Sequence, residues 1–186
     1  TAPDVFYPTS TTVLLLRAAR RSLVHRPRSV LDIGCGCGIV AIVLAKCLPP
    51  DALVYASDVS AAAVRLARSN VSRNGVKVEC RMGSLFEPWA GEQFDLIVDD
   101  VAGVAEPIAR ASGWYPDAVP SEAGRDGTRW ILDVLAQAPG HLTPKGRFIF
   151  PVLTLSREAA VLEAARARFA EVELVEEQWY PLTEEL

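Results

Sequence analysis

The chain has 186 residues, of which 50% are hydrophobic and 23% are charged, enough for one domain with a substantial core. Its net charge of -4 excludes an overall attraction to nucleic acid; the arginines between residues 17 and 28 are expected to form the solvated face of a helix or, alternatively, a local basic patch. Because no apolar run reaches the ~18 residues of a membrane span and the first residues do not resemble a signal peptide, we expect a cytoplasmic protein without membrane contact.

Hydrophobic periodicity and Gly or Pro punctuation predict alternating helices and strands along the chain. A helix that begins at residue 9 through Ser and Thr ends at Pro27, and a short apolar strand at residues 29–33 stops at glycines. The further expected helices cover residues 39–48, 61–72, 128–138 and 157–168, and the further expected strands cover residues 53–57, 76–81, 94–99, 146–152 and 172–179. The long irregular connection at residues 103–127 is expected to carry specificity.

This alternation predicts an α/β fold with a doubly wound, mostly parallel sheet of the Rossmann-like kind. The sequence shows no internal repeat and no linker composition. We therefore expect residues 1–186 to form a single domain, with a helical N-terminal segment at residues 1–28 and a Rossmann-like core at residues 29–186.

The first predicted strand ends in a glycine-rich turn with the spacing Gly-x-Gly-x-Gly, formed by Gly34, Gly36 and Gly38. In an open parallel sheet, ligands bind beyond the carboxyl ends of the central strands. Glycines at this place let the backbone pass close to a ligand and present amides at the start of the next helix. The spacing is one residue tighter than the dinucleotide fingerprint Gly-x-Gly-x-x-Gly.

Two acidic residues lie beside this turn in the predicted fold. Asp58 follows the second strand, where a carboxylate can accept hydrogen bonds from both ribose hydroxyls of a nucleoside; the alternative is an N-cap of the next helix. Asp32 lies inside an apolar strand and needs partners, either the ammonium group of a ligand or nearby amides; the alternative is backbone contacts only.

The cysteines and histidines do not indicate a metal site. Cys35 and Cys37 lie one residue apart inside the glycine-rich turn, which suits neither a disulfide framework nor zinc. The alternative is a divalent cation at Asp99 and Asp100, but the strand at residues 147–151 ends without a further acid or amide. We therefore predict no metal.

Residues 30–38, with the sequence VLDIGCGCG, resemble motif I of class I S-adenosylmethionine-dependent methyltransferases, and residues 54–58, VYASD, resemble their second-strand acid. Residues 5–15, 83–88 and 123–127 resemble, more narrowly, the family that methylates glutamine in release factors and ribosomal proteins. The resemblance covers nearly the whole chain.

The resemblance implies S-adenosylmethionine as cofactor, with S-adenosylhomocysteine as product. By the same resemblance, the cofactor-binding residues are Thr12 near the methionine end, Asp32, Gly34, Cys35, Gly36 and Gly38 around the amino acid, Asp58 on the ribose, Ser84 and Leu85 beside the adenine, and also Val59 and Asp99. Ser84 departs from the family's aspartate and is a weaker acceptor for the adenine amino group.

The sequence departs from the family where glutamine methyltransferases carry Asn/Asp-Pro-Pro-Tyr. Here residues 99–103 read DDVAG, so both prolines and the aromatic ring of the amide clamp are missing. Asp100 remains at the leading polar position. It is the candidate catalytic residue and a substrate contact, as an acceptor of a proton or hydrogen bond; the alternative is a loop-capping role.

Four further residues are candidate substrate contacts. Trp114 and Tyr115, in the irregular connection, are expected either to cover a flat substrate or to anchor the loop. Arg125 is a candidate partner for a substrate carboxylate, with a surface salt bridge as the alternative, and Tyr7 is a further specificity residue.

The function expected from these observations is methyl transfer to O, N or C of a small molecule by a monomer or homodimer that contacts neither nucleic acid nor membrane. The alternatives are a protein glutamine or RNA methyltransferase with an altered motif and a non-catalytic cofactor-binding module. The closing antiparallel strand of the usual fold is expected to be absent, truncated or supplied by a partner, because only residues 180–186 follow the last predicted strand.

Overall fold

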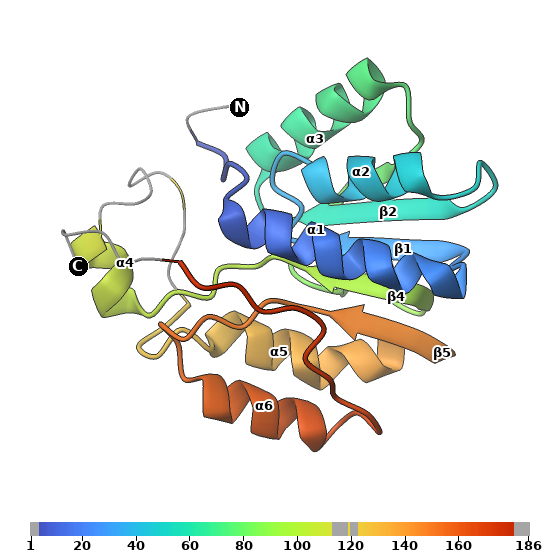
Figure 1. Ribbon diagram of the computed structural model, residues 1–186. Coiled ribbons are helices and arrows are strands. Elements are labelled where there is room, and N and C mark those ends of the chain that lie inside the picture. The colour runs from blue at the N-terminus through green and yellow to red at the C-terminus, as the bar shows by residue number, and fades with distance from the viewer. Residues whose placement is uncertain (1–3, 113–118, 120–122, 181–186) are drawn as a thin grey trace.

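A computed structural model describes residues 4–112, 119 and 123–180 and shows a sheet with helices on both faces (Figure 1). The five strands are β1 (Ser29–Ile33), β2 (Leu53–Asp58), β3 (Glu79–Met82), β4 (Phe94–Asp99) and β5 (Leu142–Ile149). All strand pairs are parallel, in the order β3-β2-β1-β4-β5, so the winding direction reverses between β1 and β4. The prediction of a doubly wound Rossmann-like sheet is therefore confirmed.

The helices form one layer on each face of the sheet (Figure 1). On one face lie α1 (Ser10–Ser22), α2 (Ile39–Cys47) and α3 (Ala61–Asn74), and on the other lie α5 (Arg129–Gln137) and α6 (Glu158–Arg166). A short α4 (Glu106–Ser112) and the 3-10 turns η1 (Leu23–His25), η2 (Glu87–Trp89) and η3 (Ala138–His141) complete the described part. Successive side chains of β1 point to opposite faces of the sheet. Val30 packs in the core beneath α1, α2 and α3, and Leu31 packs in the core on the side of α5.

The register of the central strands places their carboxyl ends side by side. Ile33, the last residue of β1, is opposite Ser57 of β2 and Asp99 of β4. The glycine-rich turn after β1, Asp58 at the end of β2 and the acids at the end of β4 therefore meet at one edge of the sheet. This edge is where an open parallel sheet binds ligands.

Two predictions about local structure are wrong. Residues 172–179 were expected as a strand but make no ladder bonds; they run along α1, where Glu176 lies near two arginines. The connection at residues 103–127 is not wholly irregular, because it contains α4. The described part of the sheet is thus all parallel, without a closing antiparallel strand.

None of the described helices is long and apolar enough to cross a membrane. The division into a helical segment at residues 1–28 and a core at residues 29–186 stays a prediction.

Candidate functional site

The glycine-rich turn passes directly from β1 into α2. Gly34, Gly36 and Gly38 all have positive φ angles, of 68°, 51° and 80°, which glycine adopts at no steric cost. A Cβ on Gly34 would lie 2.9 Å from Cγ1 of Val101, so the turn packs tightly against the residues after β4. The missing side chain of Gly34 therefore lets the residues after β4 pack against the turn at the point where the two central strands end.

The amides of this turn are used inside the protein. The N–H of Cys35 donates to the carbonyl of Ser57 over 2.9 Å, and the N–H of Gly38 donates to the carbonyl of Cys35 over 2.7 Å. The Cys35 side chain is buried in the core, and burial raises the pKa of its thiol. These two amides therefore hold the shape of the turn, and the contact of the turn with a ligand stays a prediction.

Asp58 bridges the glycine turn and the start of α3. One carboxylate oxygen accepts a hydrogen bond from the N–H of Gly36 over 2.9 Å, and the other accepts from the N–H of Ser60 over 2.8 Å. The N-cap of α3 is Ser60, whose hydroxyl oxygen accepts from the N–H of Ala63, so the alternative of an N-cap at Asp58 is wrong. Each carboxylate oxygen keeps a second lone pair for a hydroxyl donor.

Asp32 is fully buried between the sheet and α2. Its Oδ2 accepts from the N–H of Ala41 over 3.0 Å, whereas Oδ1 has no hydrogen-bond partner among the described residues. Burial raises the pKa of this carboxyl well above its ordinary value. One oxygen is thus held by a backbone amide, and the other is buried without a donor among the described residues, so a contact with a ligand stays a prediction.

The end of β4 adds two more carboxyls. Asp99 Oδ1 accepts from the N–H of Val101 over 3.0 Å, and its buried Oδ2 finds no partner within the described part of the chain. Burial raises the pKa of Asp99 to about 8. Burial also raises the pKa of Asp100 to about 6, where a hydrogen bond from Thr12 opposes the rise.

A hydroxyl of α1 is bonded to Asp100. Thr12 Oγ1 donates to Oδ2 of Asp100 over 2.7 Å and accepts from the N–H of Thr9 over 3.2 Å. The Thr9 amide thus occupies one lone pair of the Thr12 oxygen, and the hydroxyl proton points to Asp100. The bond joins the first helix to the end of β4 and leaves Oδ1 of Asp100 for another donor.

A cavity of about 60 Å³ lies beside Asp100, at the carboxyl ends of β4 and β5. Its lining combines the acids with the N-terminal segment and the loop after β5, and includes Phe6, Thr9, Thr11, Asp99, Asp100, Val104, Ile131 and Leu153. Sequence reasoning missed Phe6, Thr9 and Thr11 as site residues. The signal that could have found them is their nearness in sequence to Thr12, because all three lie at or just before the first turn of α1.

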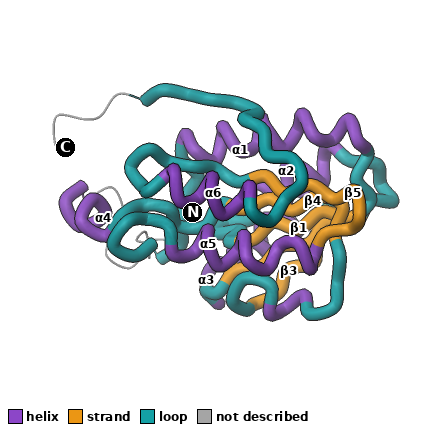
Figure 2. Tube along the Cα trace, turned by 90° about the horizontal axis from the view of Figure 1, so that it is seen from below, coloured by secondary structure: helices purple, strands orange, loops and turns teal. Residues whose placement is uncertain are grey.

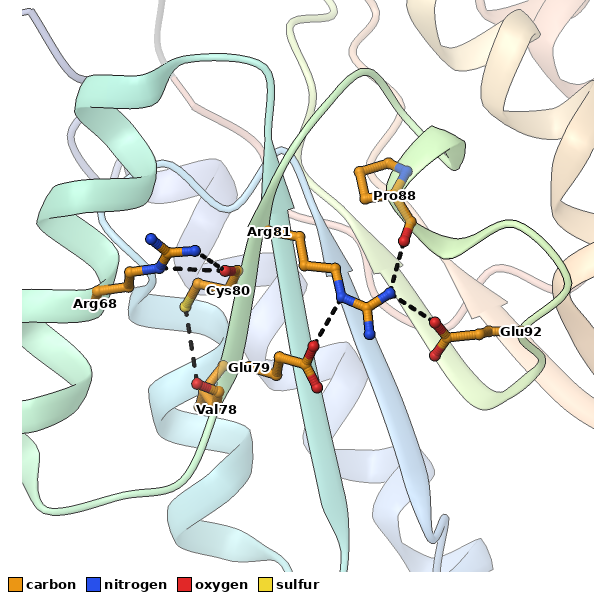
Figure 3. Close-up of polar contacts among 7 residues, drawn as sticks. All are labelled: Arg68, Val78, Glu79, Cys80, Arg81, Pro88 and Glu92. Carbon is orange, nitrogen blue, oxygen red and sulfur yellow. Dashed lines mark hydrogen bonds and ion pairs between the residues drawn. The ribbon is translucent and has the colours of Figure 1, made fainter.

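The loop after β3 is held by an arginine network at the edge of the sheet (Figure 3). Arg81 donates to the carbonyl of Pro88 over 2.7 Å and to Glu92 over 2.6 Å, and its guanidinium lies 4.2 Å from the centre of the Trp89 ring. A second arginine, Arg68 of α3, donates twice to the carbonyl of Cys80. This network fixes the loop that contains the predicted adenine contacts.

Those contacts lie in a strained turn. Leu85 has a positive φ angle of 47°, uncommon for a residue with a side chain, and the N–H of Ser84 donates to Glu87 over 3.2 Å. Val59, predicted as a further cofactor-binding residue, is strongly exposed after Asp58.

The structure brings together the predicted cofactor residues near the strand ends, and of the described substrate candidates it places Asp100 at the cavity. Tyr7 and Arg125 are exposed, and Trp114 and Tyr115 lie outside the described residues. No group of three metal-ligating side chains gathers in the described ranges, 4–112, 119 and 123–180.

Comparison with known proteins places the chain in a family. Residues 8–100 match the family model described as "Methyltransferase small domain". The chain belongs to this methyltransferase family. Over 150 residues it is 35% identical to the release factor glutamine methyltransferase of Geobacter sulfurreducens, an alignment that covers 77% of this chain and 51% of the relative. The chain therefore spans about half the length of the curated relatives it matches.

Solved methyltransferase structures share the fold. The ribosomal protein L11 methylase of Lactobacillus delbrueckii subsp. bulgaricus superposes with a TM-score of 0.67 at 25% identity, over 88% of this chain and 70% of that one. The 16S rRNA N2 G1207 methyltransferase of T. thermophilus, solved with AdoMet and guanosine, superposes with a TM-score of 0.67 at 19% identity, over 92% of this chain and 41% of that one.

These findings confirm the predictions of the family, the class I methyltransferase fold and the cofactor S-adenosylmethionine. They contradict the expectation of a small-molecule acceptor without nucleic acid. The relatives are named for a release factor, a ribosomal protein and a ribosomal RNA, which are macromolecules.

Proposed function

We propose that this chain transfers the methyl group of S-adenosylmethionine to a side-chain amide nitrogen of a protein of the translation machinery. The observation that carries the proposal is the meeting, at one edge of the sheet, of the glycine turn with carboxyl oxygens that lack partners among the described residues. The relatives named for glutamine methylation support the choice of acceptor. A cytoplasmic location belongs to the proposal, since translation factors and ribosomes act there.

The residues at this edge fit the cofactor. Oδ1 of Asp32 and Oδ2 of Asp99 are buried acceptors without a donor in the described part, so an ammonium group would satisfy them. Asp58 has lone pairs for the ribose hydroxyls, and the amino-acid tail would lie beside the glycine turn. When bound, S-adenosylmethionine supplies an activated methyl group on a sulfonium.

Asp100 is the residue that we propose meets the acceptor. Because Thr12 occupies Oδ2, the free Oδ1 can accept a hydrogen bond from the acceptor N–H and so orient the nitrogen. As the nitrogen gains the methyl group it loses a proton, and a carboxylate with a pKa of about 6 can take that proton up. Asp100 would thus do part of the work of the missing amide clamp.

Labelled methyl transfer tests the proposal. We expect purified enzyme and S-adenosylmethionine with a labelled methyl group to label release factors or ribosomal proteins, with mass spectrometry placing the methyl group on a glutamine. Deproteinised ribosomal RNA and a small-molecule extract serve as parallel acceptors. Label found only in the RNA or only in the extract would contradict the proposal.

A further inference from the structure

The surface of α1 and η1 is strongly basic in an acidic chain. Residues 10–28 contain five arginines and no Asp or Glu, although the net charge of the whole chain is -4. The helix buries Leu15, Ala18 and Ala19 on one side. Its outer side carries Arg17 and Arg21, whose side chains are 60% and 62% exposed. The apolar periodicity thus points the positive charges away from the core.

The segment at residues 171–180 returns along this outer side of α1 (Figures 1 and 2). Arg21 donates to the carbonyl of Val175 over 2.8 Å, and the hydroxyl of Tyr180 donates to the carbonyl of Ser10 over 3.2 Å. The segment is therefore antiparallel to the helix, and its end lies near the start of α1.

An open hollow of about 320 Å³ lies between the helix and this segment, lined by Arg17, Arg20, Arg21 and Glu176. Glu176 is 3.8 Å from Arg17 and 3.7 Å from Arg21, longer than a hydrogen bond, and its buried Oε2 accepts none from the described residues. Two guanidinium groups, those of Arg17 and Arg21, thus share one carboxylate through loose ion pairs, and Arg20 adds a third positive charge to the lining. The hollow keeps an excess of positive charge and of unused N–H donors, which suits an anion with several oxygens.

We propose that this outer face of α1, with the hollow and Trp179, binds the phosphate backbone of single-stranded RNA. Trp179 is 78% exposed and directly precedes Tyr180, which bonds to Ser10 at the start of α1; the arginines follow about 10 Å further along the helix. Arginines for phosphates and an exposed ring for base stacking are the two components of single-strand recognition. An acidic protein surface would match the arginines but leaves the tryptophan unexplained.

The proposed surface leads to the candidate active site. Ser10, which contacts Tyr180, is two residues from Thr12, and Thr12 donates to Asp100. RNA lying along α1 would therefore end beside the methyl-transfer edge. A ribosomal protein surrounded by ribosomal RNA would then lie close to the methyl-transfer edge, which is the link to the proposed function. The RNA binding itself does not depend on which atom is methylated.

Fluorescence anisotropy with a labelled oligouridylate of about 12 nucleotides, at several salt concentrations and without cofactor, tests the proposal. We expect Arg17→Gln, Arg20→Gln and Arg21→Gln together to weaken binding at least tenfold and to reduce the slope of log K against log salt by about 2, since each phosphate contact contributes about 0.7. Trp179→Ala should weaken binding about fivefold or more with little change of slope.

The matched control replaces three exposed arginines elsewhere, Arg65, Arg73 and Arg166, by Gln, with the same change of net charge. It should leave affinity and slope nearly unchanged. Equal losses in the two triple variants, both folded by circular dichroism, would overturn the proposal. Poly-glutamate serves as a second ligand that imitates an acidic protein. If the variant with Arg17, Arg20 and Arg21 replaced by Gln loses poly-glutamate binding but keeps its RNA binding, the proposal is also overturned, in favour of a protein partner. Because no methyl transfer is measured, failure of the proposed function would not affect this result.

Discussion

At the scale of single residues, the site depends on aspartates with different surroundings. Asp58 accepts two backbone N–H bonds, whereas Asp32 and Asp99 are buried with one oxygen each lacking a partner in the described part of the chain. Burial disfavours the charged form, so the pKa values of Asp32 and Asp99 rise. A cation at this edge would lower both pKa values again and would be bound more tightly as they ionise.

The glycine turn gives a prediction at this scale. Gly34→Ala should destabilise the protein by about 2 kcal/mol or more, because the new Cβ would lie 2.9 Å from Val101 Cγ1 at a φ angle of 68°. Gly75→Ala is the control: φ is 64° there, but nothing lies within 4 Å of the new Cβ, so we expect only about 1 kcal/mol of backbone strain. Urea unfolding measures both, and equal losses would show that the contact with Val101 is unimportant.

At the scale of elements, a single hydrogen bond joins α1 to the end of β4. Thr12 and Asp100 are 88 residues apart in sequence. The bond between them holds the N-terminal segment next to Asp100, and both line the same cavity or lie directly beside it. The helix therefore has two roles, one in placing this hydroxyl and one in carrying the basic outer face.

Thr12→Val should shift the pH profile of methyl transfer. The threonine hydroxyl stabilises the charged form of Asp100, whose pKa is about 6, so its removal raises that pKa further. The acid limb of kcat should then move to higher pH. Thr12→Ser keeps a hydroxyl and should retain the original profile. An unmoved acid limb in Thr12→Val would mean that Asp100 does not set the pH dependence.

Much of this could be predicted from the sequence where the signal is local. The glycine turn, Asp58 and the strand ends follow from spacing and from the rule that parallel strands present their carboxyl ends at one edge. The bond from Thr12 to Asp100 and the cavity lining could not be predicted, because they join segments far apart in the chain. Residues 172–179 have the composition of a strand, but they make no hydrogen-bond ladder with the sheet. Instead, Glu176 forms ion pairs with arginines of α1.

At the scale of the whole molecule, the residues that we assign to the cofactor and to the acceptor lie at one edge of the sheet. The cofactor residues, Asp100 and the start of α1 meet there, and the basic face of α1 extends from it (Figure 1). The charge of the molecule is divided accordingly, with the arginines of residues 10–28 outside and the buried aspartates inside. This division separates the surface that we propose for a polyanion from the sheet edge that we propose for a cationic cofactor.

Calorimetric titration with S-adenosylmethionine tests the central claim most directly, on the wild-type protein, Asp58→Ala and the exposed control Asp51→Ala. The account predicts saturable binding to the wild type, the same affinity for Asp51→Ala, and at least tenfold weaker binding for Asp58→Ala, which loses the acceptor for the ribose hydroxyls. Equal affinity of the wild type and a folded Asp58→Ala protein would contradict it.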